Sequence, residues 1–471
     1  MIKLRTTLLF TISLLVVSLG YSANFPIEVF DLSKYSQNPN SYLPTSSENY
    51  KKPLISKSDQ NLFLNDLISH SVGDDSPWSK QFVESYLQKN NIATIQHQLN
   101  NQINNDKLSK DYKVYQENYR LLNNEEYKKV ISNIALLDSN ELKYNKNNRA
   151  IITKTTMSYT VPYDRPLYYD FKSVGNGYPF STINQSSVNI GQAIYIVSTS
   201  IDKKWLLVLS DSFYGWVKAD SVSKISDTQI KKWQSLFIKQ RLSVRDFNSS
   251  ILSNDGKSFL KDAFPGTMLP IISQDKKYYD ILIPTSSSTK LKFVKAKISK
   301  KSAVQIPLVA TPENFVKVIS QTIGYPYGWG NQYFYNDCSS EIRSIYQTFG
   351  IWLPRNSSDQ GLVYPSINLD NKTPDERIKI LMDKGRPLLD FIELKGHVMI
   401  YFGKGKNINN PNETVPIIYQ QSWGLRDGKN TKRSIIGMSN IIPLLNLYPQ
   451  DTSLKGEQAG DHFRIVQISK P

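Results

Sequence analysis

The sequence has little cysteine, little histidine and a deficit of acidic residues. Among 471 residues there are one Cys and four His, and 41 Asp and Glu stand against 57 Lys and Arg, a net charge of +16. One cysteine cannot form an internal disulfide, and no His or acidic residues stand at metal-ligand spacing, so the sequence predicts neither a disulfide framework nor a metal or other cofactor. The positive charge fits either an ordinary soluble surface or attraction to a polyanion. No nucleic-acid-binding motif accompanies it, so nucleic acid is not the expected partner.

Long apolar runs are also scarce, and the one that suggests targeting is too short to span a membrane comfortably. It covers Leu8–Leu19, follows Lys3 and Arg5, and precedes small residues at Gly20-Tyr21-Ser22. This pattern predicts a secretory signal over residues 1–22. We therefore expect an exported protein, periplasmic or secreted, without stable membrane insertion after cleavage; an uncleaved anchor is the alternative. The sequence gives no indication of oligomeric state.

The sequence pattern of the rest of the chain predicts four successive units. Aromatic content of 11% can supply sizeable cores, and 471 residues are too many for one ordinary core. Helical spacing comes first, as in Phe63 and Leu67, and short strands follow, as in Ala193–Val197 and Trp205–Leu209. A similar pattern of short strands and turns recurs around Gly266–Ile272, which indicates two sister barrels. The predicted units are a helical N-terminal region at 23–142, small β-barrels at 143–226 and 227–304, and an α+β block at 305–471.

The single cysteine, Cys338, stands where a helix is expected to begin. Ile342, Ile345, Tyr346 and Phe349 are spaced as one apolar helical face, and that face starts after Cys338. At a helix N-terminus, unpaired backbone N–H groups and the positive end of the dipole favour thiolate over thiol. The same N–H groups can hold an oxyanion during attack on a carbonyl. Cys338 is therefore a candidate nucleophile; a buried, inert thiol is the alternative.

A thiolate nucleophile needs a base, which a histidine can supply. Only His397 lies in a strong predicted strand, where alternation places it on the face shared by Met399 and Tyr401. His462, near the C-terminus, is a weaker rival, and His70 and His97 lie in the polar helical region, where surface positions are expected. The alternative is that His397 is a structural histidine at a sheet end.

The base in turn needs a partner that orients it. The strand predicted at 415–421 ends in Gln420 and Gln421, and either amide oxygen can accept the imidazole N–H and fix its tautomer. A neutral partner stabilises imidazolium less than a carboxylate does. Two polar residues at a strand end are also common, so this third member is the least specific of the set.

Four ordered motifs surround these candidates. They are Tyr327-Gly328-Trp329-Gly330 before Asp337-Cys338-Ser339, then Leu353-Pro354-Arg355-Asn356-Ser357 with Gln360, then Gly396–Tyr401 with Gly403, and last Tyr419–Arg426. In this order they resemble the NlpC family of bacterial cell-wall cysteine endopeptidases. The resemblance implies a C-terminal α+β papain-like cysteine peptidase domain. Two departures are present: Asn331 follows Gly330 where the family usually has glycine, and Ser340 replaces the glycine after Cys-Ser. Neither removes a reacting group.

Upstream motifs extend the resemblance to a multidomain branch of the family. Pro179-Phe180, Gly191 and Gly215-Trp216-Val217 are similar to a bacterial SH3-like barrel, and Asp75-Ser76-Pro77-Trp78 is similar to a motif in that branch's helical domain. The implied layout is a helical stabilising domain, two SH3-like barrels and the catalytic domain. The barrels would either anchor the protein to the wall or border the active cleft, which would restrict substrates to peptides with a free N-terminus.

The family's roles carry over to matching residues. Cys338 would be the nucleophile, His397 the general base and Gln420 the third residue, with Gln421 remaining possible. The residues that would line the substrate pocket are Tyr327, Asp337 and Ser339. The Asp337 carboxylate suits a substrate ammonium group by charge pairing, and it also suits a helix N-cap.

The implied reaction is hydrolysis of peptidoglycan stem peptides between γ-D-glutamate and a diamino acid, with peptidoglycan or muropeptides as the partner. One alternative is a catalytically weak or inactive cell-wall-binding protein, which the neutral third residue suggests. Another is an amidase or acyltransferase on the same fold. The sequence does not identify the diamino acid.

Overall fold

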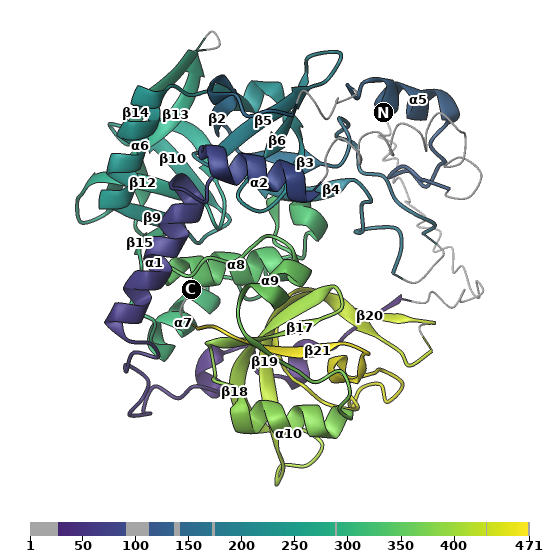
Figure 1. Ribbon diagram of the computed structural model, residues 1–471. Coiled ribbons are helices and arrows are strands. Elements are labelled where there is room, and N and C mark those ends of the chain that lie inside the picture. The colour runs from purple at the N-terminus through teal and green to yellow at the C-terminus, as the bar shows by residue number, and fades with distance from the viewer. Residues whose placement is uncertain are drawn as a thin grey trace, which may run out of the picture.

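A computed structural model describes the chain at residues 27–90, 113–135, 142–171, 175–287, 290–429 and 431–469. The signal predicted at 1–22 and His97 lie outside these ranges. Three seven-stranded sheets organise the chain, with the two barrels at one end of the molecule and the third sheet at the other (Figure 1). Within the described ranges, no helix combines the length and the apolar character needed to cross a membrane.

The two barrels have the same topology. The strand order is β4-β3-β7-β6-β5-β2-β8 in the first and β11-β10-β14-β13-β12-β9-β15 in the second, which is the first order shifted by seven. Gly191 and Gly266 precede β5 and β12, and both have φ of 85°, a left-handed conformation that favours glycine. These findings confirm the sister barrels predicted from the sequence repeat. The strands are β2 (Arg149–Ile152), β3 (Thr156–Tyr159), β4 (Asn184–Val188), β5 (Ala193–Thr199), β6 (Trp205–Leu209), β7 (Tyr214–Lys218), β8 (Val222–Lys224), β9 (Arg241–Val244), β10 (Ser249–Ser253), β11 (Phe259–Ala263), β12 (Met268–Gln274), β13 (Tyr278–Ser287), β14 (Lys290–Ser299) and β15 (Ala303–Ile306).

The third sheet and its helices form the α+β domain. Its strand order is β1-β20-β19-β18-β17-β21-β16, and all neighbours are antiparallel except β1 and β20. Helix α8 packs on β18 and β19, as the predicted papain-like arrangement requires. The elements are α7 (Pro312–Ile319), α8 (Cys338–Thr348), α9 (Ser357–Val363), β16 (Ser366–Asn368), α10 (Pro374–Lys384), β17 (Asp390–Leu394), β18 (His397–Lys406), β19 (Thr414–Arg426), β20 (Arg433–Pro443) and β21 (Phe463–Gln467).

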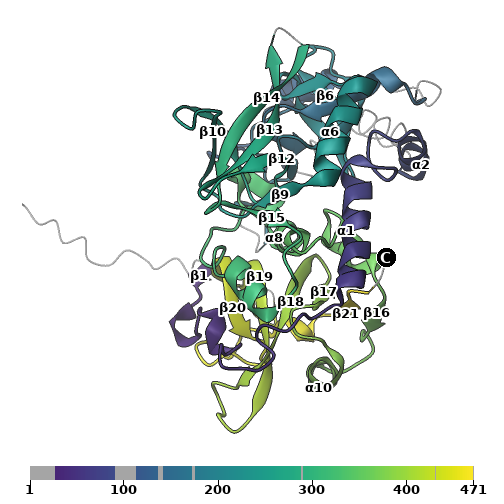
Figure 2. The same ribbon diagram turned by 90° about the vertical axis from the view of Figure 1, so that its left-hand side faces the viewer.

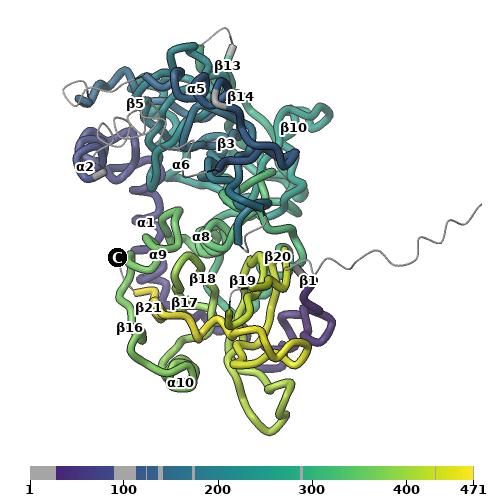
Figure 3. The backbone as a smooth tube through the Cα atoms, turned by 90° about the vertical axis from the view of Figure 1, so that its right-hand side faces the viewer, coloured from purple at the N-terminus to yellow at the C-terminus, as the bar shows by residue number. Residues whose placement is uncertain are grey.

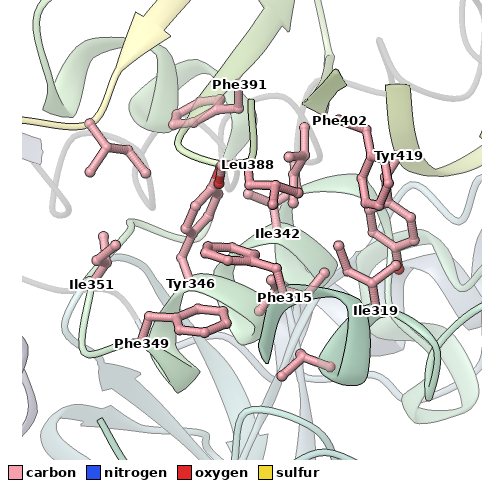
Figure 4. Packing of buried hydrophobic residues seen from close by; sticks show 14 of the residues in the cluster. Phe315, Ile319, Ile342, Tyr346, Phe349, Ile351, Leu388, Phe391, Phe402 and Tyr419 are labelled. Carbon is pink, nitrogen blue, oxygen red and sulfur yellow. The ribbon is translucent and has the colours of Figure 1, made fainter. Parts of the chain in front are cut away.

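The apolar face of α8 anchors the helix against the sheet. Ile342, Tyr346 and Phe349 are fully buried, and the Phe349 ring stacks on Phe315 of α7 at 3.9 Å between centroids (Figure 4). Each such side chain contributes on the order of 1.5–3 kcal/mol by leaving water. This packing confirms the predicted helical face and holds the N-terminus of α8, with Cys338, next to the strands that carry the base.

The N-terminal region, predicted as helical at 23–142, combines helices with one strand among the residues that the structure describes. It begins with β1 (Ile27–Val29), which adds a parallel strand to β20 (Figure 3). Helix α1 (Lys57–Val72) then runs along the molecule from the α+β domain to the barrels (Figure 2). Helices α2 (Lys80–Asn90) and α5 (Asn124–Ser132) pack with the first barrel, and α6 (Asp227–Lys239) joins the two barrels.

The side chains of this region join cores that belong to the other units. Phe63 lies in the core of the α+β domain, whereas Val72 and Trp78 lie in the core centred on the second barrel. The Trp78 indole also donates to the Ala150 carbonyl of the first barrel at 2.8 Å. Helical spacing in the sequence predicts that one face of a helix is buried, but it does not predict which hydrophobic core that face joins. The boundaries drawn between the predicted units therefore remain predictions.

Candidate active site

The predicted nucleophile occupies the first position of α8. Asp337 caps this helix through its Oδ1, which accepts the Ser340 N–H at 3.0 Å. Cys338 is only 5% exposed, but it borders a cavity of about 260 Å³ that is also lined by Asn184 and Gln185 of the first barrel. The thiol therefore lies at the edge of the core and at the wall of a cavity, rather than among aliphatic side chains alone.

The predicted base faces this thiol. His397 is the first residue of β18, and its Nε2 lies 2.5 Å from Oε1 of Gln420. Burial lowers the pKa of His397, but the charge of Cys338 and a hydrogen bond with it act in the opposite direction, aided by Glu457 and Gln420. The net effect raises the pKa to about 9. A charged imidazolium beside a thiolate is the ion pair that a cysteine nucleophile needs.

Of the two glutamines at the end of the predicted strand, Gln420 contacts the imidazole. Gln421 lies on the opposite face of β19, where its Nε2 donates to the backbone oxygens of Tyr325 and Pro326 at 3.1 and 3.2 Å. Successive side chains of a strand point to opposite faces, so only one of the pair can reach His397. The geometry therefore favours Gln420 as the third residue.

A partly buried carboxylate that the sequence analysis did not single out completes this group. Oε1 of Glu457 lies 3.6 Å from Nε2 of His397, and its Oε2 accepts a hydrogen bond from Nε2 of Gln420 at 3.2 Å. Burial raises the pKa of Glu457, whereas the charge of His397 and the bond from Gln420 oppose that rise. The neutral third residue, Gln420, is thus hydrogen-bonded to an acidic side chain, that of Glu457.

Glu457 reaches this position because of the turn that carries it. It opens a short 3-10 helix, Glu457–Ala459, and follows Gly456. A Cβ on Gly456 would lie 2.0 Å from the Leu445 carbonyl oxygen, so this close approach requires glycine. A lone Glu in a polar C-terminal loop gives no periodic or motif signal. Only a glycine directly before it hinted at a constrained backbone.

Asp337 and Ser339, predicted to bind substrate, form a buried network with Arg355. The Arg355 guanidinium donates to both Asp337 carboxylate oxygens, at 2.7 and 3.1 Å, and to Oγ of Ser339 at 2.8 Å. Burial raises the pKa of Asp337, but the charge and hydrogen bonds of Arg355 outweigh it, and the net pKa is lowered. The negative charge available to a substrate ammonium is therefore already balanced by an arginine.

Tyr327, the third predicted pocket residue, lies on the other side of the thiol. Burial raises its pKa well above the usual value, and the charges of Cys338 and Asp337 add to the rise. It lines a larger cleft of about 600 Å³ together with His397 and Trp423. The phenol therefore keeps its proton and is a possible donor beside the sulfur.

The first barrel contributes to the wall of this cleft. Phe180 packs edge-on against Trp329 and Trp423, with ring centroids 5.2 and 6.1 Å apart. Tyr178 also contacts Trp423, at 5.9 Å. The active cleft is consequently built by two units of the chain.

The other described histidines have different partners, although His462 lines the same cleft as His397. Nε2 of His462 lies 2.5 Å from Oε2 of Glu393, and its Nδ1 lies 3.1 Å from Asp370, so it is not free to serve as the base. His70 stacks on Trp352 with ring centroids 3.6 Å apart. The expected surface position of His70 is therefore wrong, because the polar helix that carries it packs against the α+β domain.

A thiol at a helix N-terminus, facing an imidazole on a neighbouring antiparallel strand, is the arrangement of a papain-like cysteine peptidase. Residues 324–426 match the NlpC/P60 family, and residues 166–218 match the SH3 domain of the SH3b1 type. The chain thus carries an NlpC/P60 domain and an SH3 domain of this type. The resemblance inferred from the sequence motifs is confirmed.

Two curated relatives have the same name, γ-D-glutamyl-L-lysine dipeptidyl-peptidase. The protein of Bacillus cereus is 27% identical over 157 residues, which cover 32% of this chain and 45% of the relative. That of Bacillus subtilis is 22% identical over 238 residues, which cover 48% of this chain and 72% of the relative. The match thus spans less than half of the Bacillus cereus protein.

One solved structure, an NlpC/P60 endopeptidase from Photobacterium damselae subsp. piscicida, matches nearly the whole chain. The alignment covers 93% of this chain and 98% of that one, with a TM-score of 0.75 and 21% sequence identity. At this identity the likeness establishes the fold, which extends beyond the NlpC/P60 domain to the barrels and the N-terminal region.

Proposed function

We propose that this protein is a cysteine peptidase that hydrolyses peptidoglycan stem peptides at the bond between γ-D-glutamate and a diamino acid. The observation that carries the proposal is the group in which His397 lies between Cys338 and the Gln420–Glu457 pair. This arrangement supplies a nucleophile, a proton carrier and a charge that stabilises imidazolium. It requires no metal.

The proposed reaction begins when the Cys338 thiolate attacks the carbonyl carbon of the γ-glutamyl amide. Backbone N–H groups of the first turn of α8, which have no partner within the helix, and the Tyr327 phenol would hold the oxyanion. His397 then gives its proton to the departing nitrogen, the C–N bond breaks, and a thioester remains on Cys338. The amine leaves on the side of the imidazole.

Hydrolysis of the thioester completes the cycle. His397, now neutral, takes a proton from a water molecule as the water attacks the thioester carbonyl. The C–S bond breaks, the γ-carboxyl group is released and gives the second water proton to the solvent, and the thiolate–imidazolium pair is restored. Gln420 would fix the orientation of the ring through both steps, and Glu457 would stabilise its charged form.

Three observations support the substrate. The two curated relatives are named for a γ-D-glutamyl bond. The net charge of +16 suits an anionic wall polymer. The first barrel narrows the cleft through Phe180, which favours a small peptide over an intact wall. We further propose that the protein is exported, periplasmic or secreted, since its substrate lies outside the cytoplasm.

The test is digestion of purified L-alanyl-γ-D-glutamyl-diamino acid peptides, followed by product masses. The parent protein is expected to release the L-alanyl-γ-D-glutamate dipeptide, whereas Cys338→Ala and His397→Ala are expected to release none. His462→Asn is the matched control, because it removes the imidazole that is bound to Glu393. It is expected to retain most of the activity.

Other outcomes would contradict the proposal. Equal product from the parent and Cys338→Ala would favour a cell-wall-binding protein without catalysis. Release of the whole peptide from muramic acid would indicate an amidase, and a product heavier than the hydrolytic one would indicate acyl transfer.

A further inference from the structure

The larger cleft carries an excess of positive charge. Four cationic side chains line it, and the carboxylates beside them are Asp461 and Glu457, of which Glu457 already interacts with His397 and Gln420. The cations are Lys395, Arg426, Arg433 and Lys455. This cleft also contains the imidazole, so its charge lies next to the reacting bond.

Two of these cations face each other without a counter-charge. Arg426 of β19 and Arg433 of β20 are directly opposed partners in the antiparallel pair. Like charges in this position repel each other. Among the residues that the structure describes, neither guanidinium forms an ion pair or a side-chain hydrogen bond, and the Nε of Arg433 is buried without an acceptor. An anion that binds between the two guanidinium groups would reduce this repulsion and accept their open N–H groups.

The electrostatics of Arg433 agree with this conclusion. Burial lowers its pKa, and the charge of Arg426 lowers it further. A planar guanidinium binds a carboxylate through two parallel N–H···O bonds, and each new bond relieves the repulsion between the arginines. The geometry thus suits a carboxylate better than a neutral group.

The position of this pair relative to His397 identifies which part of a substrate it meets. In the proposed reaction the leaving nitrogen takes its proton from His397, so the residue on the amine side occupies the cleft that His397 lines. The acyl side occupies the smaller cavity with Cys338, Asp337 and Ser339.

We propose that Arg426 and Arg433 form a carboxylate-binding subsite for the residue that leaves as the amine. This inference rests on the proposed function. The carboxylate has two possible sources, the α-carboxylate at the end of a tripeptide or a side-chain carboxylate of the diamino acid. Lysine offers only the first, and diaminopimelate offers both.

Four substrates separate these sources. They share L-alanyl-γ-D-glutamate and end in lysine, lysine amide, diaminopimelate, or diaminopimelate with its α-carboxyl amidated. Lysine amide has no carboxylate on the amine side. The parent is expected to cut carboxylate-bearing peptides with a kcat/KM about 10- to 100-fold above that of lysine amide, the range for hydrogen bonds to a charged group. A preference that the free lysine peptide shares assigns the α-carboxylate, and one confined to diaminopimelate assigns the side chain.

Variants connect this preference to the arginines. Arg433→Gln and Arg426→Gln are each expected to reduce the ratio of kcat/KM between the carboxylate and amide peptides to within about threefold. Arg433→Lys keeps the charge but lacks the planar guanidinium, so it is expected to give an intermediate ratio. Lys395→Gln is the matched control, because it removes a charge from the same cleft away from the β19–β20 pair. It is expected to preserve the ratio.

A binding measurement keeps the subsite testable apart from catalysis. The four peptides are titrated into the Cys338→Ala protein by calorimetry, which reports the same order of affinity whether or not the parent cuts any bond. Equal affinities and equal kcat/KM for all four peptides would overturn the inference, as would an unchanged ratio in Arg433→Gln. Failure of the parent to cut any peptide, with ordered affinities, would instead contradict the proposed function alone.

Discussion

The smaller cavity, which Cys338 borders, and the larger cleft, which His397 lines, use charge in opposite ways. In the smaller one, Asp337 and Arg355 are buried and fully paired. In the larger one, Arg426 and Arg433 face each other without a partner among the described residues. A buried ion pair fixes the relative positions of its two side chains, because separating them leaves a charge buried without a partner. Unpaired charges at a cleft wall leave bonding capacity for a ligand. The paired charges of the first cavity suit the positioning of the proposed nucleophile, and the open charges of the second suit the proposed carboxylate subsite.

The largest expected effect comes from breaking the buried ion pair between Asp337 and Arg355. Arg355→Met leaves the Asp337 carboxylate buried and unpaired, which should destabilise the protein by about 3–5 kcal/mol. Arg426→Met is the matched control: it removes an exposed, unpaired charge and should change the stability by less than about 0.5 kcal/mol. Thermal and urea unfolding of both variants measure the difference. Equal losses would contradict the contrast between the two cavities.

The pH dependence of the same pair sharpens this prediction. Asp337 has a folded pKa below its ordinary value of 3.8, so its contribution to stability is present above pH 3.8 and is lost as the pH falls through the folded pKa. In Arg355→Met the carboxyl prefers its protonated form. The stability gap between parent and variant should therefore narrow as the pH falls, first above pH 3.8 as the carboxyl of the variant takes up its proton, and then below pH 3.8 as that of the parent does.

The second effect concerns Glu457, which we propose as a positioning residue for His397. Glu457→Gln should lower kcat/KM by roughly 10- to 100-fold, the equivalent of about 1.4–2.7 kcal/mol of barrier. The charge of Glu457 helps to raise the His397 pKa to about 9. The basic limb of the pH–rate profile should therefore move to lower pH in the variant, whereas a purely structural residue would leave that limb in place.

Stability gives an independent check on Glu457. Its folded pKa is raised above the ordinary 4.5, so ionisation of this partly buried carboxyl costs stability as the pH rises above 4.5. Glu457→Gln should accordingly be at least as stable as the parent at neutral pH, although it is less active. Glu457→Asp, which keeps the charge on a shorter side chain, should recover part of the rate. A variant that loses stability and keeps its pH profile would make Glu457 structural.

A third effect compares the sister barrels. In the first, residues 160–183 join β3 to β4 and carry Phe180 into the cleft; in the second, residues 254–258 join the corresponding β10 and β11. Phe180→Ala should raise KM about 2- to 10-fold with little change in kcat, because aromatic pairs are worth about 0.5–1.5 kcal/mol. Phe264→Ala, which breaks a stack on Phe334 outside the cleft, should lower stability and leave KM unchanged. Equal KM changes would give both barrels the same role.

The smallest effect concerns the substrate's amino end. Because Arg355 already balances Asp337, acetylation of the L-alanine nitrogen should change kcat/KM by less than about threefold. Paired measurements on free and acetylated peptides test this. A loss of a hundredfold or more would restore the expectation that Asp337 binds an ammonium group and that free N-termini are required.

Much of the site was predictable because its members carry local signals. Cys338 precedes an apolar helical face, and His397 begins an alternating strand, so each was identified by periodicity within its own element. The ambiguity between Gln420 and Gln421 arose because adjacent strand residues differ only in the face they present. The register of β19 against β18 settles which face meets the imidazole.

The sequence alone determined the local elements of this protein: the helix that presents a lone thiol, the strand that presents an imidazole, and the repeated strands of two barrels. These follow from side-chain periodicity, which acts over a few residues. Tertiary structure alone decided the groups assembled across the chain: Glu457 behind Gln420, Arg355 on Asp337, and Arg426 against Arg433. Their distances and charges depend on folding and strand register, and no local pattern records which buried charges end up paired and which stay open to a ligand.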